Sequence, residues 1–355
     1  MDGAREIGAH APRSAMMLPT LRLGSTGESV SALCLGTMYF GTTVDEPAAF
    51  ALLDAYRDAG GTFLDTANCY AFWEGDGSES ETLLGRYLAE RRSRDDTFLA
   101  TKVGSAPAYP GAPWPDEVEL LTAERIVGSV DESLRRLQTD RIDLLYAHRD
   151  DRGTPLDETL EAFARLVQAG KVRHLGASNT RAWRLATARE RSRANGWPAY
   201  ACLQQKYTYL RPAPGRAFGF QLWAGREVRD LARAEGVGLL AYSPLLSGAY
   251  TREDRAIPPE FDGPDTDARL AALAEVADET GATANQIVLA WMLAQGIVPV
   301  ISASTRRQLD ENLGAAALDL SDEHLARLSG ARAVRAPRHV PKPDVPEVAS
   351  TGTSP

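Results

Sequence analysis

Residues 142–177 read IDLLYAHRDDRGTPLDETLEAFARLVQAGKVRHLGA, and this stretch says most about the fold of the chain. It holds two short apolar runs, at 142–148 and 172–177, on either side of an amphipathic segment that ends in glycine. Such alternation is typical of parallel strands joined by crossover helices, with glycine as a helix C-cap. Because both runs are almost continuously apolar, we expect strands that are buried on both faces.

The same alternation continues in both directions along the chain. Eight strands are predicted, at 31–36, 62–65, 97–101, 142–148, 172–177, 200–204, 237–242 and 297–301. Eight such units favour an α/β fold, a (β/α)8 TIM barrel of parallel strands, although strand number alone does not exclude an open doubly wound sheet. An open dinucleotide-binding sheet needs G-x-G-x-x-G directly after a strand. The only match, at 236–241, follows a helix and leads into a strand, which is the reverse order.

The barrel is expected to occupy residues 18–330 as one domain. Residues 21–23 are followed by GSTGES, which predicts a short β-hairpin ahead of the first barrel strand, closing the N-terminal mouth. Residues 1–17 and the proline-rich residues 331–355 lack apolar periodicity. Since such segments do not offset the entropy of ordering, we expect them to be flexible tails.

Composition limits the partners and the compartment. A net charge of -9 argues against nucleic acid or an anionic membrane as the main partner, because both reward clustered cations. Cys34, Cys69 and Cys202 show no C-x-x-C spacing, which argues against a disulfide framework and a zinc cluster. With no apolar stretch of signal-peptide or membrane-helix length, the sequence predicts a cytoplasmic protein. Nothing in it predicts an oligomeric state.

Four polar residues stand at the ends of three neighbouring predicted strands. Asp65 ends one run, Tyr70 follows it in FLDTANCY, and Lys102 and His148 come at the ends of the next two. Reactive groups of barrel enzymes gather at the carboxyl ends of the strands. Each residue alone has an ordinary structural explanation, as a helix cap, a surface lysine or a packed histidine. Together they predict a catalytic cluster.

The chemistry of this cluster is coherent. A phenol with a reference pKa near ~10 is a weak acid unless a neighbouring cation stabilises its anion, and Lys102 offers that charge. Asp65 would hold Lys102 in place and charged, while His148 would orient a carbonyl oxygen by a hydrogen bond. We therefore expect proton delivery to an oxygen that becomes negative as hydride reaches the carbon.

With these residues and flanks, the chain resembles the aldo-keto reductase superfamily. The Asp, Tyr, Lys and His tetrad of that family matches Asp65, Tyr70, Lys102 and His148 in order and context. The resemblance spans residues 21–328 and includes LGTMYFG (35–41), SLRRLQTDRIDLLYAHRDD (133–151) and GKVRHLGASN (170–179). It implies an NADPH-dependent reduction of an aldehyde or ketone, with Tyr70 as the general acid.

The resemblance also implies contacts to NADPH/NADP+ along the barrel mouth. Besides Asp65, they are Gly36, Thr37 and Met38 beside the nicotinamide ribose; Ser178, Asn179 and Gln204 on the carboxamide; Tyr242 stacked on the nicotinamide; Ser243, Pro244 and Leu245 beside the pyrophosphate; Ser304, Thr305 and Arg306 on the 2′-phosphate; and Gln308, Glu311 and Asn312 at the adenine nucleotide. A helix N-terminus suits such a phosphate. The chain departs from the family at Ala249, where a lysine often helps to hold the pyrophosphate.

Phe72, Trp73, Trp114 and Arg149 are the candidate substrate-binding residues, because they follow strands two to four. Loop packing explains the aromatic ones equally well. Other barrel functions fit less well: a metal hydrolase commonly needs an H-x-H pair, which is absent, and no metal is expected. A Schiff-base lyase needs a lysine of lowered pKa, which Asp65 opposes. A nucleotide-binding redox sensor with little turnover remains the alternative.

Overall fold

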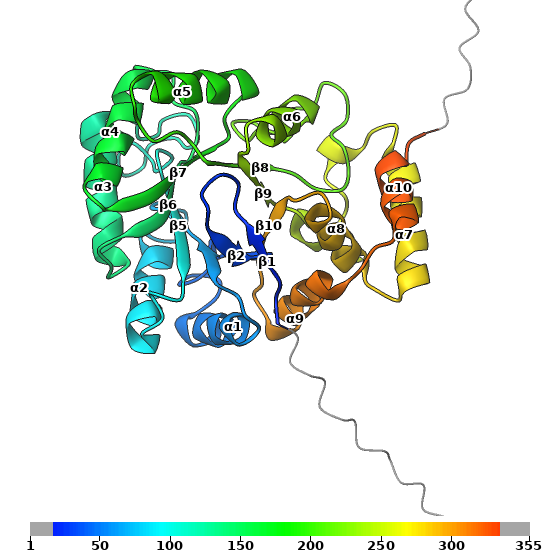
Figure 1. Ribbon diagram of the computed structural model, residues 1–355. Helices are drawn as coiled ribbons and strands as arrows, with labels where there is room; N and C mark the ends of the chain where they lie inside the picture. Colours follow the sequence, from blue (N-terminus) through cyan, green and yellow to red (C-terminus); the bar gives the residue numbers. More distant parts are fainter. Residues whose placement is uncertain (1–16, 334–355) are drawn as a thin grey trace, which may run out of the picture.

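The computed structural model describes residues 17–333, which form a closed barrel surrounded by helices (Figure 1). Eight parallel strands close in the order β10-β3-β4-β5-β6-β7-β8-β9. These strands are β3 (Cys34–Gly36), β4 (Phe63–Asp65), β5 (Phe98–Val103), β6 (Ile142–Ala147), β7 (Val172–Ser178), β8 (Cys202–Lys206), β9 (Gly238–Tyr242) and β10 (Val298–Ile301). The (β/α)8 barrel predicted from the sequence is confirmed.

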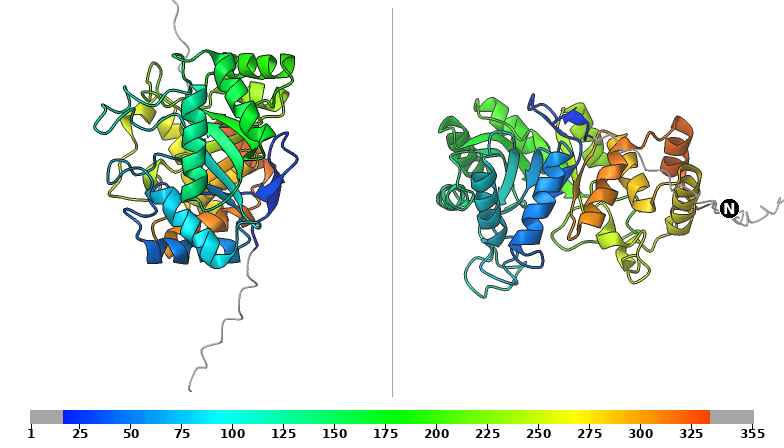
Figure 2. Two further views of the ribbon diagram at one scale, coloured as in Figure 1. Left: turned by 90° about the vertical axis from the view of Figure 1, so that its left-hand side faces the viewer. Right: turned by 90° about the horizontal axis from the view of Figure 1, so that it is seen from below.

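The helices lie outside the barrel, as Figures 1 and 2 show. They are α1 (Glu46–Asp58), α2 (Glu79–Arg91), α3 (Ala123–Arg136), α4 (Leu156–Gln168), α5 (Ala182–Ala194), α6 (Arg226–Ala234), α7 (Thr266–Thr280), α8 (Ala284–Leu293), α9 (Arg306–Gly314) and α10 (Asp322–Gly330), with short 3-10 turns η1 (Leu246–Gly248), η2 (Pro259–Phe261) and η3 (Ala315–Ala317). Helices α7 and α10 lie side by side beyond α8, so they form an addition to the ring.

A two-stranded antiparallel hairpin covers one end of the barrel, as predicted. It consists of β1 (Thr20–Arg22) and β2 (Ser29–Ser31), with Leu21 opposite Val30. Leu23 and Val30 are fully buried in the same cluster as the inner barrel residues. Gly24 has a φ of 51° and a Cβ there would lie 2.3 Å from the Gly238 nitrogen, so only glycine allows this approach.

The first predicted barrel strand, 31–36, was wrong in its first residues. Ser31 belongs to the hairpin, and the barrel strand begins at Cys34. The Ser31 hydroxyl accepts hydrogen bonds from the backbone nitrogens of Thr62 and Phe63, at 3.1 and 3.2 Å. Because these bonds satisfy a buried polar side chain, they hold the chain at the bend between the hairpin and the barrel. Apart from residues 17 and 331–333, the predicted tails lie outside the described residues.

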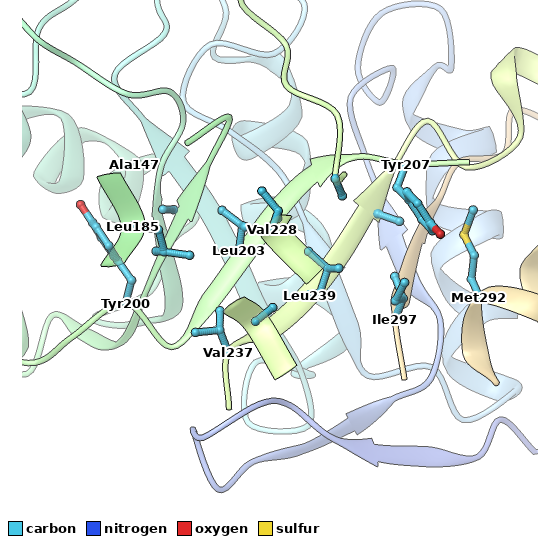
Figure 3. Packing of buried hydrophobic residues seen from close by; sticks show 14 of the residues in the cluster. Ala147, Leu185, Tyr200, Leu203, Tyr207, Val228, Val237, Leu239, Met292 and Ile297 are labelled. Atoms are coloured by element: carbon cyan, nitrogen blue, oxygen red, sulfur yellow. The ribbon is translucent and has the colours of Figure 1, made fainter. Parts of the chain in front are cut away.

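Side chains alternate between the inside and the outside of the barrel, as they must along a strand. Outward residues such as Leu203 and Leu239 pack toward helices, and Figure 3 shows them beside Val228 of α6. Burying one such side chain stabilises the fold by about 1.5–3 kcal/mol. Inward residues fill the hairpin end of the barrel, where the rings of Phe63 and Phe98 meet edge to face at 5.0 Å.

The inner apolar layer sets the position of the polar residues above it. A polar layer lies two residues farther along the same strands than the inner apolar residues Phe63, Ala100, Tyr146, Cys202 and Leu240. It consists of Asp65, Lys102, His148, Gln204 and Tyr242. Gly176 makes room for this arrangement, because a Cβ there would lie 2.5 Å from the ring of Tyr146. The strand period therefore brings the polar side chains to the carboxyl end of the barrel.

Candidate active site

Lys102 is the centre of the polar layer. Its ammonium donates to Asp65 Oδ1 at 2.5 Å, to the Thr66 carbonyl at 2.7 Å and to Tyr70 Oη at 2.7 Å. Lys102 is 0% and Asp65 1% exposed. The second carboxylate oxygen of Asp65 accepts a 2.8 Å hydrogen bond from Gln204 Nε2. The three donors of the ammonium are thus satisfied, and the ion pair is fully withdrawn from water.

His148 completes the tetrad expected from the sequence. It directly follows β6, and its ring meets that of Tyr70 edge to face at 5.9 Å. Its Nδ1 lies 3.8 Å from Cys69 Sγ. The backbone is fixed on both sides, since the His148 nitrogen donates to Val103 and its carbonyl accepts from Asn179 Nδ2. The structure therefore brings the four predicted residues together.

The pKa of Tyr70 differs from the sequence-based expectation. Burial raises the pKa of the phenol to about 12, and Asp65 adds to this, while Lys102 lowers it without prevailing. The expectation that the charge of Lys102 would make the phenol more acidic was wrong: because Asp65 balances the lysine charge, desolvation dominates. For Lys102 itself, burial opposes the charge, but Asp65 and Tyr70 raise the pKa overall.

The pKa of His148 shifts in the direction that keeps the ring neutral. Burial lowers it well below its ordinary value, and the positive charges of Lys102 and Arg149 lower it further. At neutral pH the ring therefore carries one proton, on one of its two nitrogens. A neutral imidazole of this kind donates a hydrogen bond from that nitrogen but is a poor proton source.

Asn179 joins several parts of the mouth. It has a φ of 48°, a conformation that asparagine tolerates better than most residues. Its Oδ1 accepts from Tyr242 Oη at 2.7 Å and from the Leu222 nitrogen at 3.1 Å, while its Nδ2 donates to His148 and to Ser178 Oγ. Ser178, Asn179, Gln204 and Tyr242 are thus gathered beside the tetrad, as the sequence predicts.

Some of the other residues predicted to bind the cofactor are exposed, whereas the rest are buried or already hydrogen-bonded within the protein. Gly36, the last residue of β3, and Met38 are partly exposed, but Thr37 is 0% exposed and its hydroxyl donates to the Asp65 carbonyl at 3.1 Å. Its side chain therefore supports Asp65 and is closed to a ligand. After β9, Ser243 is exposed and Leu245 partly so, whereas Pro244 is buried with its carbonyl accepting from a threonine.

Helix α9 begins with exposed polar side chains. Thr305 is its N-cap, accepting from the Gln308 nitrogen at 3.3 Å, and Ser304 and Arg306 are exposed beside it. Gln308 Oε1 accepts from Ser304 at 2.9 Å. Farther along, Glu311 accepts from Thr283 and Asn285, and Asn312 is 4% exposed with its amide on the Ser302 carbonyl. The first turn of α9 is open, whereas Glu311 and Asn312 already have partners.

The four predicted substrate residues form one cluster at the rim. The ring of Phe72 lies 5.3 Å from Trp73 and 5.4 Å from Trp114. Trp114 lies 5.3 Å from Phe220, and the Arg149 guanidinium lies 5.0 Å from that same ring. The rim cluster of these five residues thus joins the loops that follow β4, β5, β6 and β8.

Two residues of this region were not predicted from the sequence. Phe220 belongs to the long loop between β8 and α6, where the run FGFQLW offered an unused signal of apolar packing. Lys206 lies two residues beyond Gln204, so the strand period could have placed it inside the mouth. Its ammonium donates to Gln221 Oε1 at 3.1 Å and lies 6.0 Å from the Tyr242 ring centre.

Two features are absent from residues 17–333. No cluster of three or more His, Cys, Asp or Glu side chains in this part of the chain is arranged to hold a metal ion. None of the helices described has both the length and the apolar character that a membrane crossing requires.

The closed barrel and the polar cluster at its carboxyl end define a barrel enzyme of the type that the sequence resembles. The aldo/keto reductase family profile matches residues 32–333. YrpG, an uncharacterized oxidoreductase of Bacillus subtilis, is 34% identical over 317 residues, covering 86% of this chain and 94% of that protein. Norsolorinic acid reductase stcV of Emericella nidulans is also 34% identical, covering 84% and 77%, and the aldo-keto reductase str7 of Strobilurus tenacellus is 33% identical, covering 88% and 91%.

The chain therefore belongs to the aldo/keto reductase family. As a member it is an oxidoreductase of a family that reduces carbonyl groups with a nicotinamide nucleotide.

Proposed function

We propose that this enzyme reduces an aldehyde or ketone to an alcohol with NADPH and that Tyr70 is the general acid. The observation that carries the proposal is the single ammonium of Lys102, which bonds both Tyr70 Oη and Asp65 Oδ1. A cation held in this way stabilises the phenolate that forms when the phenol gives up its proton. Such fixed charge, directed at the place where negative charge develops, is an effective form of catalysis.

The protonation states support Tyr70, and not His148, as the acid. With a pKa near 12 the phenol holds its proton throughout the neutral range. His148 is neutral there, so a nitrogen of its ring is suited to donate a hydrogen bond that orients the carbonyl oxygen. Tyr70 would then pass its proton to that oxygen. We expect a rate that is flat from pH ~6 to ~9 for this reason.

The residues at the mouth fit a nicotinamide nucleotide. The hydroxyl of Ser178 and the amide of Gln204 are suited to a carboxamide; they are 1% and 2% exposed and lie beside the partly exposed ring of Tyr242. When bound, NADPH would supply the hydride. These side chains, with Asp65 held by Gln204, would fix the orientation of the nicotinamide, while the accessible Gly36 and Met38 would lie beside its ribose.

The open first turn of α9 supports NADPH over NADH. Arg306 is exposed, and its partner is Asp310 one turn along, in an exposed pair worth about 0.3–0.5 kcal/mol. Such a weak pair is readily exchanged for a phosphate, which also gains the free backbone N–H groups of the helix N-terminus. Ser304 and Thr305 would add hydroxyl donors.

The cytoplasmic location expected from the sequence remains a prediction.

The test is NADPH consumption with a broad panel of aldehydes and ketones, run in parallel with NADH. We expect turnover with a preference for NADPH, and we expect Arg306→Ser to reduce that preference at least tenfold with little effect on the NADH reaction. Arg307→Ser, one position along the same exposed turn, is the matched comparison.

Two outcomes would reject parts of the proposal. Tight NADPH binding without turnover of any carbonyl would favour a nucleotide-binding sensor. Absence of nucleotide binding would reject the proposal altogether.

A further inference from the structure

Arg149 is a half-buried cation at the barrel mouth, next to His148. Its Nη1 donates to the Pro115 carbonyl at 2.8 Å, and its guanidinium lies over the ring of Phe220. Within residues 17–333, Nε and Nη2 of Arg149 make no hydrogen bond, and no carboxylate lies within 4.0 Å of the guanidinium. Arg149 is partly exposed, and within residues 17–333 neither nitrogen is a fully buried atom without a partner.

The absence of an ion pair is notable because two aspartates follow Arg149 in the sequence. Asp150 is paired with Arg184 at 2.9 Å and with Arg152 at 3.1 Å. Asp151 accepts from the backbone nitrogens of Leu121 and Gly153, both at 2.7 Å. The carboxylates next to Arg149 in the sequence thus have other partners, and neither is paired with Arg149.

Withdrawing the positive charge of Arg149 partly from water costs free energy. Burial lowers the pKa of Arg149, and Asp116 and Asp151 only partly offset this at longer range. A guanidinium nevertheless stays charged, because its reference pKa is above ~12. A half-buried charge with unused donors gains most from an anionic ligand, preferably one that accepts two parallel hydrogen bonds.

The aromatic residues around Arg149 add a second condition on the ligand. Trp73 and Trp114 are 49% and 40% exposed, and they belong to the same rim cluster as Phe72 and Phe220. Exposed neighbouring aromatic rings on loops mark a binding surface more often than isolated exposed residues do. Flat ligands stack well on such rings, so the rim combines an aromatic surface with one uncompensated cation.

We propose that Arg149 and the rim aromatics form a subsite for aromatic carbonyl compounds that carry an anionic group, such as a carboxylate. The guanidinium would bind the anion, Phe220 and Trp114 would contact the ring system, and the carbonyl end would lie toward Tyr70 and His148. This inference rests on the proposed reductase function. It adds the substrate class, which the tetrad leaves open.

Ligand binding tests this without depending on turnover. The probes are 2-naphthoate and 2-naphthamide, which have the same ring system but differ in charge, titrated at pH 7.5 against tryptophan fluorescence. Titrations are run with and without saturating NADP+. We expect 2-naphthoate to bind at least tenfold more tightly than 2-naphthamide, as expected for a charge-assisted hydrogen bond.

Substitutions show which residue causes the preference for the anionic ligand. Arg149→Met should abolish the preference and leave 2-naphthamide binding within about twofold, whereas Arg149→Lys should retain part of it. Phe220→Leu should weaken both ligands alike. Arg152→Met is the matched control, because Arg152 is exposed in the same loop, and it should leave both affinities unchanged.

Equal affinities of the two probes for the unaltered protein would overturn the inference. So would a preference that survives Arg149→Met and disappears in Lys206→Met, because the anion site would then be on β8. In turnover, 4-carboxybenzaldehyde should be preferred over 4-formylbenzamide, its neutral analogue. Turnover of both without that preference would reject the subsite and keep the reductase, whereas an Arg149-dependent preference for 2-naphthoate without turnover of any carbonyl in the panel would reject the reductase and keep the anion site.

Discussion

The centre of the barrel mouth and its rim are built in opposite ways. At the centre, Lys102 and Asp65 are sealed from solvent and every donor of the ammonium has an acceptor. At the rim, Arg149 has unused donors in the part of the chain that the structure describes, and two tryptophans are about half exposed. The centre lies on strands, whereas the rim lies on loops. On the proposed function, this division would separate the fixed groups that perform chemistry from those that select a ligand.

The difference also predicts how stability and activity are distributed. Substitutions at the centre should damage both, because they break a satisfied buried network. Substitutions at the rim should alter ligand affinity and leave the fold almost unchanged. A central variant that stays fully stable, or a rim variant that unfolds the protein, would break this comparison.

The largest combined effect is expected for Lys102→Met. It leaves the buried Asp65 carboxylate without its cation, which should cost about 3–5 kcal/mol in the free energy of unfolding and nearly all activity. Denaturant unfolding measures the first and NADPH consumption the second. In the double variant Lys102→Met/Asp65→Asn, much of the stability should return while activity stays absent. An unchanged stability in the single variant would contradict the sealed geometry.

A smaller effect is expected from His148 when pH is lowered. The folded protein keeps this ring neutral, but the unfolded chain takes up a proton below pH ~6.5. Because the unfolded state then binds more protons, stability should fall with pH by up to about 1.4 kcal/mol per unit from this residue. Comparing the protein with His148→Gln between pH 7.5 and 5.5 isolates the contribution. Plots of unfolding free energy against pH for the two proteins should be parallel above pH 7. Parallel plots below pH 7 as well would show that the pKa of His148 is not lowered.

The smallest effect is expected for Trp73→Ala at the rim. The side chain is about half exposed and its main contact is an edge-to-face pair with Phe72. We expect less than about 1 kcal/mol of lost stability, since few of its atoms leave a packed environment. Thermal unfolding checks this. A loss comparable with that of Lys102→Met would mean that Trp73 packs the loop and is no part of a ligand surface.

The sequence predicted the barrel and the tetrad because strand periodicity connects the two. Once the apolar runs are recognised as strands, their carboxyl ends must share one mouth, and Asp65, Lys102 and His148 follow. The bend at Ser31 was not predictable, since it depends on hydrogen bonds from residues 62 and 63, which are distant in sequence.

The electrostatic and rim details were also beyond the sequence. The high pKa of Tyr70 depends on the balance between burial and two neighbouring charges, which only three-dimensional placement determines. Phe220 comes from a loop far along the chain, and loop conformation carries no periodic signal. The pairing of Asp150 with Arg184, which leaves Arg149 without a carboxylate partner within residues 17–333, is likewise a tertiary contact.

The central claim is that Tyr70 gives its proton to the carbonyl oxygen. The most direct test is the single-turnover rate of NADPH oxidation with 4-nitrobenzaldehyde in the unaltered protein and in Tyr70→Phe, together with the NADPH affinity of each. Removing a general acid should lower the rate by about 10²–10⁴-fold, with NADPH affinity and stability nearly unchanged. A Tyr70→Phe protein that oxidises bound NADPH at the original rate would contradict the account.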